Sequence, residues 1–131
     1  MTYSALTLHY FETAVSAGIL RGPDVYRGAA GDRRQGTWVQ FDVHVVAGII
    51  RAARFLAFAC PHTIAVSAWV AERSVGTASR PCLPESVQDL SDRFAVPVAK
   101  RGRLLIVEDA WVAALARGAA APTSERSGAI E

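Results

Sequence analysis

The chain has 131 residues, of which 51% are hydrophobic and 20% charged, and its formal net charge is +2. This length suits one compact domain with its own core and is too short for two ordinary domains. The hydrophobic content excludes disorder over most of the chain, and the small, scattered positive charge argues against nucleic acid as a partner.

The first half of the chain predicts one helix and three strands. Residues 37–46 give the clearest pattern, because apolar and polar residues alternate there as in a strand with one buried face. Ala47 and Gly48 predict a tight turn into the next strand, and residues 28–36 predict a polar, glycine-rich loop. Gly18 is expected to end the first helix. The expected ranges are 3–17 for the helix and 24–29, 37–46 and 49–59 for the strands.

The second half predicts three helices and a solvated tail. Gly76 and Gly118 are expected to lie just past the ends of the first and third of these helices. The expected ranges are 61–75, 84–94 and 104–117 for the helices and 119–131 for the tail. The order α-β-β-β-α-α-α predicts an α+β fold over residues 1–118, in which helices pack on one face of a three-stranded antiparallel sheet.

No apolar run approaches the ~20 residues of a membrane-spanning helix, and the N-terminus lacks a signal-peptide pattern. Two cysteines in such a chain do not indicate a disulfide framework. We therefore expect a cytoplasmic protein that binds no membrane.

Cys60 stands where the third strand meets the following helix. Pro61 suits the first helical position, which places Cys60 at the N-cap. Free amide groups and the positive end of the helix dipole lower the pKa of a thiol there, and the thiolate is a good metal ligand and sulfur nucleophile. The alternative is an inert buried cysteine, because free cysteine is among the most buried residue types.

Several segments around Cys60 resemble, in order, the IscU/NifU-type family of iron–sulfur cluster scaffolds. The resemblance covers roughly residues 3–117. It rests on Phe11-Glu12, Val39-Gln40-Phe41, Gly48-Ile49-Ile50, Ala53-Arg54-Phe55 with Cys60 and Ile64-Ala65, and Glu108-Asp109-Ala110. It implies the fold known as a SufE/NifU-like sandwich. It also implies a site with three cysteines and a histidine or an aspartate, to which a cysteine desulfurase delivers sulfur.

The chain departs from this family at its ligand positions. Cys60 is present, but Ala30 stands in place of the first cysteine, and Gly102-Arg103 in place of a His-Cys pair. Asp32 matches the family's aspartate. The family's chaperone-recognition element, Leu-Pro-Pro-Val-Lys, is altered to Val96–Lys100.

The resulting candidate site consists of Cys60, Asp32 and His62, which could bind a metal ion or a cluster together. His62 could instead be an exposed surface histidine. Arg33, Arg34 and Arg103 are expected to line the site, where guanidinium groups would favour the thiolate and bind anions. The alternative is that they are ordinary solvated loop charges. Arg101 belongs to the same two loops. Cys82 could join only if its loop folds back over Cys60. His44, on the polar face of its strand, is expected to be a satisfied or solvent-facing residue rather than a ligand.

Three hypotheses for the function remain. The first is a scaffold-like iron–sulfur cluster assembly protein that carries iron or a cluster ([2Fe-2S], or a single iron or zinc ion) on Cys60, within one chain or across a dimer. The second is a sulfur-transfer protein in which Cys60 accepts a persulfide. The third is an adaptor without a cofactor. In each case we expect no enzyme turnover, a monomer or weak homodimer, and as partners a cysteine desulfurase and an Hsp70-type chaperone.

Overall fold

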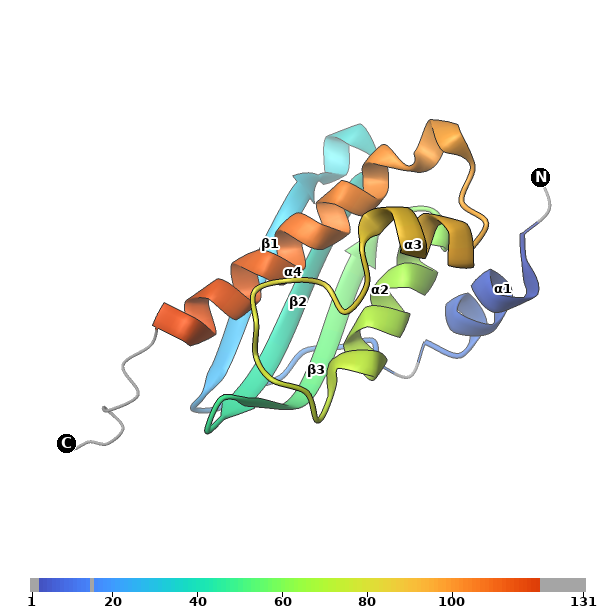
Figure 1. The fold of residues 1–131 in the computed structure, drawn as a ribbon. Helices are drawn as coiled ribbons and strands as arrows, with labels where there is room; N and C mark the ends of the chain where they lie inside the picture. Colours follow the sequence, from blue (N-terminus) through green and yellow to red (C-terminus); the bar gives the residue numbers. More distant parts are fainter. Residues whose placement is uncertain (1–2, 15, 121–131) are drawn as a thin grey trace.

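The computed structural model describes residues 3–14 and 16–120. Within these residues the elements follow the predicted order, and the three strands form an antiparallel sheet with β2 in the middle (Figure 1). The α+β fold class is confirmed. The elements are α1 (Ala5–Glu12), β1 (Val25–Asp32), the 3-10 helix η1 (Arg33–Gln35), β2 (Thr37–Val46), β3 (Ile49–Phe58), α2 (Pro61–Ser74), α3 (Val87–Arg93), the 3-10 helix η2 (Val98–Lys100) and α4 (Gly102–Ala120).

The core lies between the sheet and two helices on one of its faces. Figure 1 shows α4 lying along β1 and β2, with α2 beside it over β3. Val39, Phe41 and Val43 of β2 are fully buried beneath these helices, as the alternation predicts. Trp111 of α4 packs edge-on against Phe41, with 5.0 Å between the ring centroids. None of the described helices is long and apolar enough to cross a bilayer.

The first helix is shorter than predicted. Ser4 caps α1, since its hydroxyl accepts a hydrogen bond from the first turn. The helix ends at Glu12 rather than near Gly18, because the chain beyond it pairs with the edge of β3. The backbone N–H of Phe55 donates to Ser16 at 3.0 Å, and that of Gly18 donates to Phe55 at 2.8 Å. These bonds satisfy backbone groups that a longer helix would have paired internally.

The predicted loop over residues 28–36 is wrong in its first half, because β1 continues to Asp32. The glycines there serve packing. A Cβ atom on Gly28 would lie 2.2 Å from the backbone N of Ala114, so only glycine lets α4 approach β1 this closely. Gly31 has a φ of +91°, and a Cβ atom on it would lie 2.2 Å from the carbonyl oxygen of Thr37.

The start of α3 and the end of α4 each differ from the prediction by three residues. Ser86 caps α3, whose first residue is therefore Val87 rather than residue 84. Gly118 lies inside α4, which runs on to Ala120, and a Cβ atom on Gly118 would meet the ring of Tyr26 at 3.3 Å. The rest of the predicted tail, residues 121–131, lies outside the described residues.

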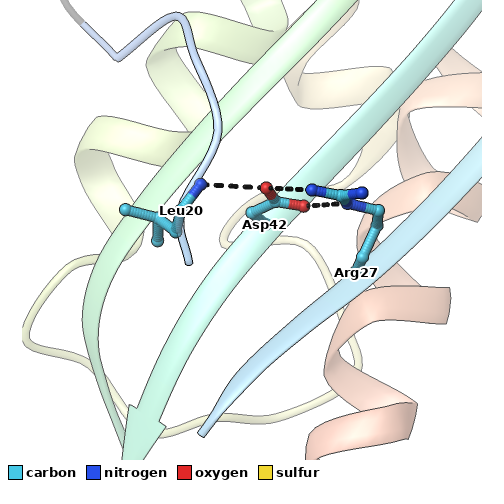
Figure 2. Close-up of polar contacts among 3 residues, drawn as sticks. All are labelled: Leu20, Arg27 and Asp42. Atoms are coloured by element: carbon cyan, nitrogen blue, oxygen red, sulfur yellow. Dashed lines mark hydrogen bonds and ion pairs between the residues drawn. The ribbon is translucent and has the colours of Figure 1, made fainter. Parts of the chain in front are cut away.

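The opposite face of the sheet, which we call the outer face, is crossed by the segment that leads from α1 to β1. Asp42 of β2 holds this segment (Figure 2). Its carboxylate accepts hydrogen bonds from the backbone N–H of Leu20 at 3.0 Å and from Nε and Nη2 of Arg27 at 2.7 and 3.0 Å. Asp42 is only 1% exposed although it lies on the polar side of β2. The paired bonds from Arg27 supply the partner that a buried carboxylate requires.

Candidate functional site

The candidate site lies at the end of the sheet where β1 and β3 finish and β2, α2 and α4 begin. Strand pairing sets Gly31 and Phe58 on either side of Trp38, so Asp32 and Cys60 leave the sheet at the same end. Arg103 arrives there on the first turn of α4. The antiparallel connections therefore bring together segments that are widely separated in the sequence, as the resemblance implied.

Cys60 is the N-cap of α2 and is followed by Pro61 at the first helical position, as predicted. Its thiol is half-buried, and Sγ lies 3.4 Å from the hydroxyl oxygen of Thr63. The N-terminus of a 14-residue helix thus faces a sulfur atom that solvent still reaches. The fully buried cysteine of the alternative is therefore wrong.

The pKa of Cys60 lies below the ordinary value of a thiol. Burial alone would raise it, but hydrogen bonding by the hydroxyl and amide of Thr63, together with hydrogen bonding and positive charge from Arg103, outweighs burial. These groups favour the thiolate, the form of cysteine that acts as a nucleophile.

His62 is buried, with 1% of its surface exposed, so the alternative of an exposed surface histidine is wrong. Its ring packs on that of Tyr3, with 4.7 Å between the centroids, and its Nδ1 atom has no hydrogen-bond partner. Burial, with the positive charges of Lys100 and Arg103, lowers the pKa of His62 below 6.5. The imidazole is therefore neutral at pH 7.

The arginines predicted to line the site have different surroundings. Arg33 stacks over the ring of Trp38, 4.4 Å from its centroid. The backbone N–H of Arg34 donates to the carboxylate of Asp32 at 2.8 Å, which makes Asp32 the cap of η1. Arg103 is the member of the set whose guanidinium group acts on both Cys60 and His62.

Within residues 3–14 and 16–120, no three side chains of histidine, cysteine, aspartate or glutamate come close enough together to hold a metal ion. Cys82 lines a surface hollow with Ile50, at the start of β3, and Ser74, at the end of α2. These are the ends of β3 and α2 that lie away from Cys60. His44 lies in the part of the sheet away from Cys60, paired with Val25 and Ala52.

Thr63 was not singled out from the sequence, although one signal was available. A serine or threonine three residues after an N-cap residue faces back toward the cap across the first turn. Nothing in the sequence pointed to Lys100 as a neighbour of His62, because η2 and α2 meet only in the tertiary structure.

The chain was compared with protein families, curated proteins and solved structures. No model of a protein family matches the chain, and no curated protein matches it in sequence. Among solved structures, an N-terminal portion of a nitrogen-fixing NifU-like protein from Brucella abortus superposes with a TM-score of 0.67 and 19% identity, over 88% of this chain and 92% of that one. A protein from Fervidobacterium islandicum, assigned as an iron–sulfur cluster assembly scaffold of the SUF system (SufU), gives 0.67 and 14%, over 86% and 96%.

The chain has the SufU/NifU fold. The superpositions span nearly the full length of both neighbours. The SufU/NifU fold thus accounts for the sheet, the two covering helices and the end of the sheet where Cys60 lies. The low identity limits this conclusion to the fold.

Proposed function

We propose that the protein works in iron–sulfur cluster assembly and that Cys60 is its sulfur acceptor. The observation that carries the proposal is a solvent-accessible thiol whose pKa is lowered by Thr63 and Arg103, at the N-terminus of α2. The SufU/NifU fold supports the pathway, because both neighbours with that fold are named as iron–sulfur scaffold or NifU-like proteins.

The reaction is a transfer of sulfane sulfur between two cysteines. The Cys60 thiolate attacks the terminal sulfur of a persulfide on the donor protein. A new S–S bond forms on Cys60 while the donor's S–S bond breaks, and the donor cysteine leaves as a thiolate. The Cys60 sulfur is oxidised and the donor cysteine sulfur is reduced by the same amount, so no further oxidant is needed. The product is a persulfide on Cys60, and the protein acts as a stoichiometric carrier rather than an enzyme.

The surroundings of Cys60 favour sulfur over a metal ion. A cluster within one chain needs several thiolate or imidazole ligands converging on one point, and no group of three candidate ligands occurs among the described residues. The positive charge of Arg103 stabilises an anionic thiolate or perthiolate and opposes a cation at the same place. The second candidate is a cluster shared by Cys60 of two chains, and its support is that one neighbour with the same fold is named as a cluster assembly scaffold.

The proposed sulfur donor is a cysteine desulfurase, and the proposed compartment is the cytoplasm. A chaperone of the Hsp70 type could recognise the segment from Val96 to Lys100. Val98, the first residue of η2, is 76% exposed, whereas Val96 is 4% exposed and belongs to the core.

The test is anaerobic incubation with a cysteine desulfurase and L-cysteine, followed by release of bound sulfane sulfur with dithiothreitol. We expect about one sulfur per chain in the wild type and in Cys82→Ser, and none in Cys60→Ser. A parallel anaerobic incubation that also contains ferrous iron, followed by iron and sulfide analysis, separates the candidates. If the wild type instead contains iron and acid-labile sulfide but no sulfane sulfur, and Cys60→Ser contains neither iron nor sulfide, the protein is a cluster carrier rather than a sulfur acceptor.

A further inference from the structure

Positive charge gathers around the first turn of α2, where Cys60 and His62 lie. Arg103 reaches this turn from the start of α4, and its guanidinium group hydrogen-bonds the Cys60 sulfur. The charges of Lys100, in η2, and of Arg103 both act on the ring of His62. Among the described residues, the charges that act on Cys60 and His62 are all positive. The sulfur therefore lies in surroundings that favour an anion.

The segment that follows β1 adds to the positive charge at this end of the sheet. Arg33 and Arg34 come directly after β1, and both are exposed. The carboxylate of Asp32 lies between them and the strand, where it accepts the backbone N–H of Arg34. Clustered cations of this kind raise the local concentration of small anions near a reactive group.

His62 offers a hydrogen-bonding atom that the described protein does not use. Its side chain is buried, and its Nδ1 atom has no partner. A buried polar atom without a partner is rare in native proteins and indicates a place for a water molecule or for a ligand group. Because Arg103 acts on both residues, the imidazole ring and the Cys60 sulfur are neighbours.

We infer that Cys60 also takes sulfur from a small oxyanion that carries a sulfane sulfur atom, and that Arg103 binds the oxyanion group of this donor. Thiosulfate is the simplest donor of this class. In the tautomer with a proton on Nδ1, His62 would donate a hydrogen bond to one of its oxygens. The inference rests on the proposed function of Cys60 as a sulfur acceptor and adds a second class of donor to it.

The reaction needs no oxidant. The Cys60 thiolate attacks the sulfane sulfur of thiosulfate, a new S–S bond forms on Cys60, the S–S bond of thiosulfate breaks, and sulfite leaves with the electron pair. The product is a persulfide on Cys60. Both reactants are anions and the leaving group gains negative charge, so a guanidinium group beside the sulfur reduces their repulsion and stabilises the sulfite.

The test measures the thiocyanate formed anaerobically from thiosulfate and cyanide in the absence of a desulfurase. Cyanide removes the terminal sulfur of the persulfide as thiocyanate and restores the thiolate. We expect the wild type and Cys82→Ser to form thiocyanate and to release one sulfite for each molecule formed. Cys60→Ser should form no more than the reaction without protein. Without cyanide, mass spectrometry should find one added sulfur atom on the peptide that contains Cys60.

Arg103→Gln separates binding of the oxyanion from activation of the thiol. The second-order rate constant for thiosulfate should fall by about tenfold or more relative to that for iodoacetamide, an uncharged reagent, because a charge-assisted hydrogen bond is lost. A residue that only favours the thiolate would lower both rate constants by the same factor. Arg93→Gln, which changes a surface arginine paired with Glu85, should alter neither. Circular dichroism checks that each variant is folded.

The outcomes distinguish this inference from the proposed function. Loading of Cys60 by a desulfurase but not by thiosulfate would overturn the oxyanion donor and leave the acceptor role intact. Equal losses with thiosulfate and iodoacetamide in Arg103→Gln would overturn oxyanion binding by Arg103. Loading by thiosulfate alone would support the inference and replace the proposed protein donor. Loading by neither donor would overturn both.

Discussion

At the scale of single residues, the chemistry of the site depends on how Arg103 and Thr63 act on one sulfur atom. Half-burial disfavours the thiolate, and these two residues reverse that preference. Hydrogen bonds to the charged form and an adjacent opposite charge both lower the pKa of an acid. The same groups would stabilise the perthiolate that sulfur transfer produces.

Replacing Arg103 by glutamine should raise the pKa of Cys60, because the variant removes a positive charge from the sulfur's surroundings. The pH dependence of the rate of alkylation by iodoacetamide reports this pKa. Its midpoint should move to higher pH in Arg103→Gln, and in Thr63→Val as well. Arg93→Gln, which changes an arginine bound to Glu85 on the surface, is the control and should not move it. An unshifted midpoint in Arg103→Gln would show that Arg103 does not act on the thiol.

His62 should make the stability of the protein depend on pH. Because its pKa is lower in the folded state than the ordinary 6.5, the unfolded chain takes up the proton first as the pH falls. Its contribution to stability is therefore complete above about pH 6.5 and is lost as the pH falls through the folded pKa. A single such group gives a slope of at most about 1.4 kcal/mol per pH unit.

Urea denaturation between pH 7.5 and pH 5 measures this slope, and His62→Phe should reduce it by keeping an aromatic ring against Tyr3 without a titrating nitrogen. A slope that is the same in His62→Phe and in wild type would contradict the assignment.

At the scale of helices and strands, the sequence predicts well where periodicity is strong. β2 has the predicted bounds, and Cys60 and Pro61 mark the start of α2 as expected. Prediction fails where long-range contacts decide the conformation. The glycines of β1 predict a loop locally, but Gly28 is needed because α4 packs on it. Similarly, the segment after Glu12 has helical composition but pairs with β3 instead.

The same contrast between local sequence patterns and long-range contacts applies to the candidate site. The sequence indicates Cys60 and its helix N-terminus, since local signals determine them. The burial of His62 and the contact of Arg33 with Trp38 depend on elements that meet only in the folded protein. The approach of Arg103 to Cys60 was expected from the resemblance, not from spacing within the chain.

The close contact of α4 with β1 predicts that Gly28→Ala destabilises the protein. The added methyl group would overlap the backbone of Ala114, and overpacking of this kind costs about 1–3 kcal/mol. Urea denaturation measures the loss. Gly102→Ala is the matched control, because no atom lies within 4 Å of its Cβ position, and it should be neutral or slightly stabilising. Equal stabilities of the two variants would contradict the packing described for Gly28.

The bonds made by Asp42 predict a second effect on stability. Asp42→Asn weakens the paired bonds from Arg27 in a buried position and should cost about 1–3 kcal/mol. Glu85→Gln, which alters the surface pair with Arg93, should cost less than about 1 kcal/mol. Urea denaturation of the two variants compares them directly. A smaller loss for Asp42→Asn than for Glu85→Gln would contradict a stabilising buried pair between Asp42 and Arg27.

At the scale of the whole molecule, the two faces of the sheet differ in how far they are covered. One face carries the hydrophobic core beneath α2 and α4. The other face is only partly covered and leaves Leu56 and Phe58 in solvent. In this chain the fold thus places a half-buried thiol of lowered pKa at the same end of the sheet as the exposed ring of Phe58.

The most direct test of the account is peptide mass spectrometry after one turnover of a cysteine desulfurase with L-cysteine, with all thiols blocked by alkylation. We predict that the peptide containing Cys60 gains the mass of one sulfur atom while the peptide containing Cys82 does not. Sulfur found on Cys82, or on neither peptide, would contradict the claim that the thiolate beside Arg103 is the acceptor.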